Sequence, residues 1–91
     1  MGRVDQPVRI DLYTRDACPL CDEARDVIAR TLARVPHEIA VHDIAADPDA
    51  EALYRYEIPV VLVDGVKRFV GHVNPALLRR LVDARQRNCK A

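Results

Sequence analysis

The sequence predicts an α/β domain in which a mixed, four-stranded sheet is flanked by helices. Three observations carry this prediction: strand-like and helical segments alternate in the first half of the chain, two strand-like runs flank an Asp-Gly pair in the second half, and a helical pattern follows them. The order βαβ, a short helix, then ββα implies parallel strands first and an antiparallel hairpin last. With 91 residues, we expect one domain over residues 1–91.

The first strand and the helix after it place a pair of cysteines. Apolar and polar residues alternate in "VRIDLYT", which predicts a strand over residues 8–14 with one buried face. Helical spacing follows over residues 19–32, with a proline in the first turn. The apolar positions of this segment are Leu20, Ala24, Val27, Ile28 and Leu32. The pattern puts Cys18 at or just before a helix N-terminus and Cys21 one turn into the helix.

The rest of the chain supplies the other elements. "VPHEIAVHDI" predicts a second strand, and "ADPDAEALYRY" predicts a short helix with Asp47 as cap and Pro48 as first residue. "PVVLVDGVKRFVG" predicts a hairpin that turns at its Asp-Gly pair. A final helix is expected to begin with Asn74 as cap and Pro75 as first residue. Its apolar residues, which we expect to face the sheet, are Leu77, Leu78, Leu81, Val82 and Ala84.

Charge and hydropathy argue against two classes of partner. Lys plus Arg and Asp plus Glu both total 14, so the formal net charge is zero and nothing indicates electrostatic binding to nucleic acid or to an anionic membrane. The longest apolar run, residues 58–63, is far shorter than the ~20 residues of a spanning helix. The first ten residues lack the apolar region of a signal peptide. We therefore expect a cytoplasmic protein with no nucleic-acid or membrane partner.

The segment "DACPLCDEA" favours redox chemistry. A helix N-terminus offers unpaired N–H groups and partial positive charge, which favour a thiolate at Cys18, and Cys21 is positioned to resolve a mixed disulfide on Cys18. Arg15 can support the anion. Three acidic residues oppose its ionisation: Asp16, Asp22 and Glu23. We therefore expect only moderate activation of Cys18.

Two other interpretations of the cysteine pair stay open. A structural zinc site usually takes four ligands as two close pairs, and this chain has one such pair. Cys89 lies in the C-terminal segment, and the three histidines are scattered: His37, His42 and His72. The third interpretation is two inert buried thiols. We rank redox chemistry first and expect no metal site.

Four segments, "YTRDACPLCDEA", "HDIAADPDA", "YRYEIPVVLVDG" and "FVGHVNPALL", together resemble the thioredoxin superfamily, most closely its small glutaredoxin-like branch. The resemblance implies a thioredoxin-like fold and a thiol-disulfide oxidoreductase whose catalytic residues are Cys18 and Cys21. It also implies that Pro59 is cis and that the Ile58 backbone pairs with a bound peptide or thiol substrate. Local physics alone favours a trans proline that starts a strand.

The chain departs from glutathione-binding glutaredoxins at the last helix. Those proteins usually carry two glycines and then an acidic residue there, whereas "VGHVNP" has only Gly71, with His72 at the second glycine and Pro75 near the acidic position. Glutathione binding in the usual manner is therefore not expected from this segment. His72 is either a substrate contact near Cys18 or a solvated loop residue, and the second is favoured.

The resemblance also sets the expected partners. Substrates would be disulfide-containing proteins or small thiols, and no bound cofactor is expected. The electrons would come from glutathione, another small thiol, or a thioredoxin-type reductase, and we expect a monomer. The alternative is a thioredoxin-fold binding domain without turnover, or one that holds a metal ion or cluster between chains. Pro19 inside the motif favours the oxidoreductase, because a Cys-Pro-x-Cys dithiol in this superfamily resembles a working enzyme.

Overall fold

The computed structural model describes residues 6–88, which form four strands and three α-helices around one core. The elements are, in order, β1 (Val8–Thr14), α1 (Pro19–Thr31), β2 (His37–Asp43), a 3-10 turn (Ile44–Ala46), α2 (Pro48–Tyr54), β3 (Val60–Val63), β4 (Val66–Val70) and α3 (Pro75–Asn88). This is the predicted order. Within the described part of the chain, no helix is long and apolar enough to cross a membrane.

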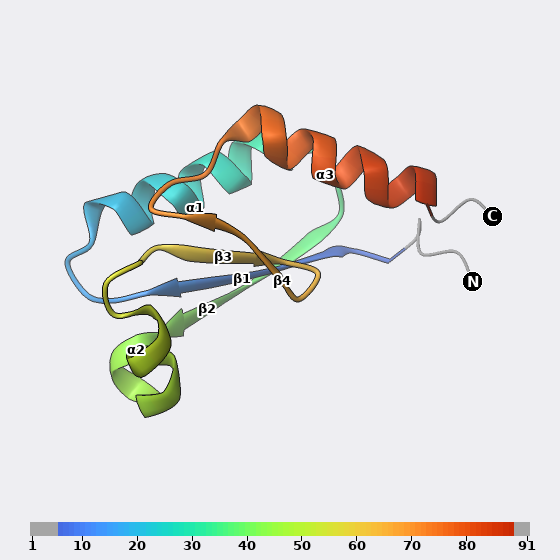
Figure 1. The fold of residues 1–91 in the computed structure, drawn as a ribbon. Helices are drawn as coiled ribbons and strands as arrows, with labels where there is room; N and C mark the ends of the chain where they lie inside the picture. The colour runs from blue at the N-terminus through green and yellow to red at the C-terminus, as the bar shows by residue number, and fades with distance from the viewer. Residues whose placement is uncertain (1–5, 89–91) are drawn as a thin grey trace.

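The four strands form one mixed sheet in the order β2-β1-β3-β4 (Figure 1). β1 pairs with β2 in parallel and with β3 antiparallel, and β3 and β4 form the hairpin. Leu12 lies opposite Val41 on β2, and Tyr13 lies opposite Val60 on β3. Because β1 and β3 run in opposite directions, the C-terminal end of β1 and the N-terminal end of β3 lie at the same end of the sheet. The predicted fold class, a four-stranded mixed α/β sheet flanked by helices, is confirmed.

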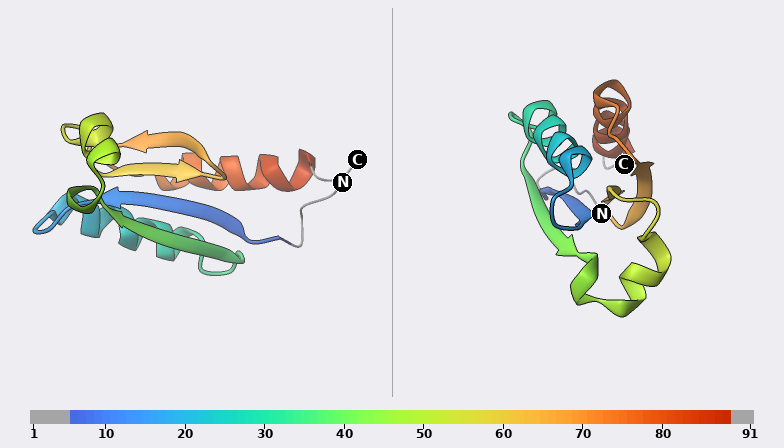
Figure 2. Two further views of the ribbon diagram at one scale, coloured as in Figure 1. Left: turned by 90° about the horizontal axis from the view of Figure 1, so that it is seen from below. Right: turned by 90° about the vertical axis from the view of Figure 1, so that its left-hand side faces the viewer.

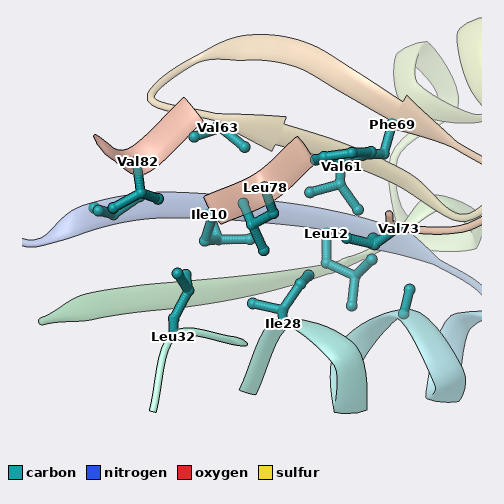
Figure 3. Packing of buried hydrophobic residues seen from close by; sticks show 12 residues of the cluster. Ile10, Leu12, Ile28, Leu32, Val61, Val63, Phe69, Val73, Leu78 and Val82 are labelled. Atoms are coloured by element: carbon teal, nitrogen blue, oxygen red, sulfur yellow. The ribbon is translucent and has the colours of Figure 1, made fainter. Parts of the chain in front are cut away.

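Helices α1 and α3 cover one face of the sheet, and the short α2 lies on the opposite side (Figure 2). The core lies between the sheet and the α1–α3 layer (Figure 3). Its largest fully buried residues include Ile10 and Leu12 from β1, Ile28 from α1, Val61 from β3 and Leu78 from α3. The apolar residues that recur every second position in β1 and about every 3.6 positions in the helices therefore pack against one another in this core.

Local signals set most element ends where the sequence predicts them. The Asp47 carboxylate accepts hydrogen bonds from the N–H groups of Asp49 and Ala50, so it caps α2. The Asn74 Oδ1 accepts one from Leu77 N–H at 3.2 Å and caps α3. In the β3–β4 hairpin, Asp64 and Gly65 both have positive φ, 50° and 86°, as a two-residue turn that matches the strand twist requires.

Two apolar residues do not face the core as predicted. Leu77 in α3 is 42% exposed and Leu20 in α1 is 50% exposed. The helical stripe of α3 centres on Leu78 and Val82, which puts Leu77 at the edge of the packed face. Leu20 lies in the first turn of α1, where the neighbouring Cys21 is the buried residue. Sequence spacing identifies the apolar side of each helix, but it does not show how many residues of that side are buried by the sheet.

The sheet face on the α2 side carries a buried carboxylate that the sequence pattern does not reveal. Asp11 is 6% exposed and accepts hydrogen bonds from Arg9 Nε at 3.2 Å and from His42 Nε2 at 2.8 Å. The His42 ring stacks on Tyr13, with ring centroids 4.6 Å apart, and Tyr13 also contacts Tyr54 of α2. This row of polar and aromatic groups connects β1, β2 and α2.

Asp11 makes stability depend on pH. Burial acts to raise the pKa of Asp11, but the hydrogen bonds from Arg9 and His42 outweigh it and hold the pKa below its ordinary value of 3.8. The carboxylate therefore stabilises the fold above pH 3.8, and this contribution is lost as the pH falls below that value. We expect Asp11→Asn to cost about 1.5–3 kcal/mol at pH 7, and the difference from wild type to shrink toward pH 3.

Urea unfolding of both proteins between pH 7 and pH 3 measures this difference. Asp83→Asn is the control, because Asp83 is exposed on α3 and makes no ion pair with the described side chains. A stability gap for Asp11→Asn that stays constant down to pH 3 would show that the charge of Asp11 is not what stabilises this face.

Candidate functional site

The two cysteines of the motif lie at the N-terminus of α1 and form a disulfide. Cys18 is the residue that caps the helix and Cys21 lies one turn in, with their Cα atoms 5.2 Å apart. Cys18 is partly exposed, whereas Cys21 is 3% exposed. The structure thus brings together the two predicted site residues and gives an outside reactant access mainly to the first.

The helix end directs hydrogen-bond donors at Cys18. The Cys21 N–H donates to Cys18 Sγ at 3.2 Å, and the N–H groups of Cys21 and Asp22 also point to the Cys18 carbonyl oxygen at 3.1 Å. Pro19 in the first turn leaves no further N–H without a partner at that position. A thiolate formed at Cys18 on reduction would accept the same donor, which is the arrangement that activates a thiol at a helix N-terminus.

The loop between β1 and α1 is tied to a distant segment. Arg15 donates a hydrogen bond from its guanidinium to the carbonyl oxygen of Arg55, forty positions along the chain. Ala17, next to Cys18, has φ 55°, in the left-handed region that a residue with a Cβ rarely adopts. Arg55 follows α2 and leads to the start of β3. Arg15 therefore links the cysteine loop to the segment that carries the predicted cis proline.

The Ile58–Pro59 peptide bond is cis, as the resemblance implies. Pro59 is buried, and its carbonyl oxygen accepts a hydrogen bond from Gly71 N–H at 2.8 Å, which connects the start of β3 to the end of β4. Ile58 is partly exposed. Since β3 starts at the end of the sheet where β1 finishes, the cis peptide and the cysteine loop lie at the same end of the molecule.

A pocket of about 240 Å³ opens beside the disulfide, on the β2 side of β1. Leu12 and Val41 supply its apolar part, and both cysteines line it together with Thr14 and Ala17. Its charged residues are Arg15, Asp16, Asp22 and Arg25. Ile58 and Pro59 are not among the lining residues, so this space, which we call the Cys18 pocket, is separate from the cis peptide on the β3 side.

The charges of the Cys18 pocket balance. Two guanidiniums and two carboxylates line it, and none of the four makes an ion pair with any side chain that the structure describes. The sequence motif identifies Arg15, Asp16 and Asp22 as neighbours of Cys18. It misses Arg25 and Val41, because Arg25 follows one helical turn after Asp22 and Val41 comes from another strand. Helical spacing from Cys18 could have found Arg25.

The remaining predicted residues lie elsewhere. His72 is exposed in the loop between β4 and α3. Cys89 lies outside the described residues. Over residues 6–88, no three side chains of His, Cys, Asp or Glu come together as ligands of a metal ion. The groups that the structure does assemble are therefore the disulfide, the cis peptide and the Cys18 pocket.

Comparison with known proteins identifies related sequences and folds. A protein-family model described as "Glutaredoxin-like domain (DUF836)" matches residues 9–83, which include both cysteines and the cis proline. No curated protein matches the chain.

Solved structures with the same fold include the target protein XcR50 from X. campestris, 28% identical, with a TM-score of 0.69 over 82% of this chain and 96% of that one. Protein Ne2328 from Nitrosomonas europaea is 18% identical, with a TM-score of 0.75 over 89% and 98% of the two chains. A mutant thioredoxin from Halobacterium salinarum is 17% identical, with a TM-score of 0.65 over 91% and 78%. The likeness to this thioredoxin shows that the fold is thioredoxin-like.

Proposed function

The chain belongs to the glutaredoxin-like domain family (DUF836), and on that premise we propose that it is a thiol-disulfide oxidoreductase that works through Cys18 and Cys21. The family and the fold support a redox function in general. The observation that carries the finer proposal is the disulfide at the N-terminus of α1, with the Cys21 N–H donating to Cys18 Sγ.

The two cysteines have different roles in this proposal. In the reduced protein, the Cys18 thiolate attacks a substrate disulfide, forms a mixed disulfide and releases one substrate thiolate. Cys21 then attacks Cys18 Sγ, so that the Cys18–Cys21 bond forms and the second substrate thiol leaves. Two electrons pass from the protein to the substrate, and the released thiolates take up two protons. The structure corresponds to the oxidised protein at the end of this sequence.

The cis peptide supports a substrate role for Ile58 and Pro59. Pro59 cannot donate a backbone hydrogen bond, and its carbonyl oxygen is occupied by Gly71 N–H. We propose that the partly exposed Ile58 offers its backbone to the substrate segment beside the disulfide. The substrate is then a disulfide-containing protein or the disulfide form of a small thiol.

The α3 N-terminus does not support glutathione binding in the manner usual for glutaredoxins. The Asn74 side chain already accepts from Leu77 N–H, Pro75 has no N–H, and His72 replaces the second glycine of the usual pattern. We propose that the reductant is a small thiol bound elsewhere, glutathione included, or a thioredoxin-type reductase. No bound cofactor takes part, and the protein acts as a cytoplasmic monomer in cell redox homeostasis.

A turnover assay tests this proposal. Reduction of a small disulfide is followed with glutathione plus its reductase and, in parallel, with thioredoxin reductase. We expect turnover with at least one electron source and the loss of two free thiols per chain on mild oxidation. If neither source gives turnover while the disulfide forms normally, the chain is a binding domain that keeps the fold and the cysteines.

The acidic residues of the pocket should tune the reduction potential. Asp16 and Asp22 line the pocket beside Cys18 and oppose a negative charge there. Neutralising both, as Asp16→Asn with Asp22→Asn, stabilises the thiolate and therefore the reduced protein. We expect the wild-type reduction potential to lie nearer about −270 mV than about −120 mV. In the double variant this potential should rise by about 10–40 mV, and the rise should become smaller as salt is added.

Equilibration with a glutathione redox buffer measures this potential. Glu23→Gln is the control, since Glu23 belongs to the same turn but does not line the Cys18 pocket. It removes one charge where the double variant removes two, so its effect should be less than half as large. A double variant whose potential falls would show that local charge does not set the redox balance.

A further inference from the structure

We propose that the Cys18 pocket binds a small zwitterionic thiol, one that carries both a carboxylate and an ammonium group, and delivers its sulfur to Cys18. This inference rests on the proposed oxidoreductase function and specifies the thiol that opens the disulfide. The pocket lies on the β2 side of the cysteines, apart from the cis peptide to which the proposed function assigns the substrate.

The size of the pocket favours a small molecule. Sites for drug-sized ligands span about 300–1,000 Å³, and this pocket has about 240 Å³. The apolar floor formed by Leu12 and Val41 suits a short aliphatic stem, and Val41 is 44% exposed because nothing in the described chain covers it. A group of the size of an amino acid, or one end of a short peptide, fits this space.

The charges of the pocket favour a ligand of both signs. Asp22 and Arg25 lie three residues apart on α1, so both side chains leave the same face of the helix. Neither makes an ion pair with a described side chain, although each lines the pocket together with Cys18. A ligand carboxylate would meet Arg25 and a ligand ammonium would meet Asp22. A ligand with only one kind of charge would be attracted by one of these two side chains and repelled by the other, which has the same sign as the ligand.

Arg15 reinforces the carboxylate side of this site. Its guanidinium is held by the hydrogen bond to the Arg55 carbonyl oxygen, so a second positive charge stays near the pocket in a fixed place. The α3 N-terminus has fewer donors for a carboxylate, because the Asn74 side chain accepts the Leu77 N–H and Pro75 has no N–H. The charged groups suited to a zwitterion therefore lie on the β2 side of the disulfide.

The chemical step is ordinary thiol-disulfide exchange. The bound thiolate attacks Cys18 Sγ, a bond forms between the ligand sulfur and Cys18, and the Cys18–Cys21 bond breaks with Cys21 leaving as a thiolate that takes up a proton. A second molecule of the thiol attacks the ligand sulfur, which releases a ligand disulfide and frees the Cys18 thiolate. Two thiols together supply the two electrons.

The test compares how four thiols open the Cys18–Cys21 disulfide of the full chain. Cysteine carries both charges, cysteamine only the ammonium, 3-mercaptopropionate only the carboxylate, and 2-mercaptoethanol neither. Rates per thiolate are read by acid quench, alkylation and mass spectrometry for wild type, Arg25→Gln and Asp22→Asn. Each rate is divided by the rate of the same protein with 2-mercaptoethanol, which removes differences in the reactivity of the protein disulfide. The normalised rate of the wild type with a given thiol is then divided by that of the variant with the same thiol. This ratio removes differences in intrinsic reactivity between the thiols.

We expect Arg25→Gln to slow cysteine and 3-mercaptopropionate by about twofold to fivefold and to leave cysteamine unchanged. Asp22→Asn should slow cysteine and cysteamine by a similar factor and leave 3-mercaptopropionate no slower. Arg80→Gln is the matched control: Arg80 is an exposed helical arginine outside the pocket, its replacement changes the net charge equally, and the three ratios for cysteine, cysteamine and 3-mercaptopropionate should stay at one.

Ratios that are the same for cysteine, cysteamine and 3-mercaptopropionate, or a control that behaves like Arg25→Gln, would overturn the pocket as a thiol site. The oxidoreductase would stand in that case, since its own test is turnover of a small disulfide. Conversely, charge-selective opening without any turnover would keep the pocket and overturn the proposed function.

Discussion

We expect Cys18→Ser to abolish turnover, because it removes the sulfur that attacks the substrate in the proposed reaction. Cys21→Ser should leave that attack intact but remove the resolving thiol, so we expect this variant to accumulate a mixed disulfide between Cys18 and the substrate. The roles follow from position: Cys18 is partly exposed and accepts the N–H of the helix end, whereas Cys21 is 3% exposed. Mass spectrometry of the intact variants after incubation with substrate measures the adduct.

Cys89→Ser provides the control for this pair. It removes the third cysteine of the chain and should keep the turnover of wild type. Equal trapping of substrate by Cys18→Ser and Cys21→Ser would contradict the assigned order of attack. Peptide mapping that placed Cys89 in the main intramolecular disulfide would replace the site altogether.

Leu78→Ala should destabilise the fold by about 2–5 kcal/mol, a large fraction of the ~5–15 kcal/mol by which small domains are stable. Leu78 is fully buried where α3 packs on the sheet, close to Ile10 and Val61 in the core (Figure 3). Truncation leaves a cavity between two rigid layers that cannot collapse to fill it. Urea unfolding at pH 7 measures the change in the free energy of unfolding.

Leu77→Ala is the matched control in the same helix. Its side chain is 42% exposed, so we expect a cost below about 1 kcal/mol. Leu78→Met, which conserves volume, should cost less than about 1.5 kcal/mol and remain folded if Leu78→Ala does not. Equal losses for the two alanine variants would mean that α3 does not pack as the structure shows.

How far the sequence predicts this protein depends on the range of the interaction concerned. Element order, the caps at Asp47 and Asn74 and the Asp-Gly turn are local features, each decided within a few residues by backbone hydrogen bonds and allowed dihedral angles. The position of Cys18 at a helix N-terminus is local in the same sense. The motif and the periodicity around it were therefore enough to place both cysteines.

The features left to tertiary structure join segments far apart in the chain. Whether Leu77 or Leu78 reaches the core depends on how α3 rotates on the sheet, and helical spacing allows both. Arg9 is a local partner of Asp11, but the second partner, His42, reaches it only once β1 and β2 pair in register, because His42 is thirty-one positions away. The cis state of Pro59 was implied by the family resemblance, whereas local energetics favour trans.

The cysteine pair shows the division most directly. By itself, the sequence determined that two thiols stand one helical turn apart at a helix end, since backbone geometry fixes that spacing. Tertiary structure decided what surrounds them. Strand order brings Val41 to one side and the cis proline to the other, and the Arg15 hydrogen bond to Arg55 holds the loop between them. Those neighbours come from packing and strand register, which depend on the whole chain at once, so no short stretch of sequence contains them.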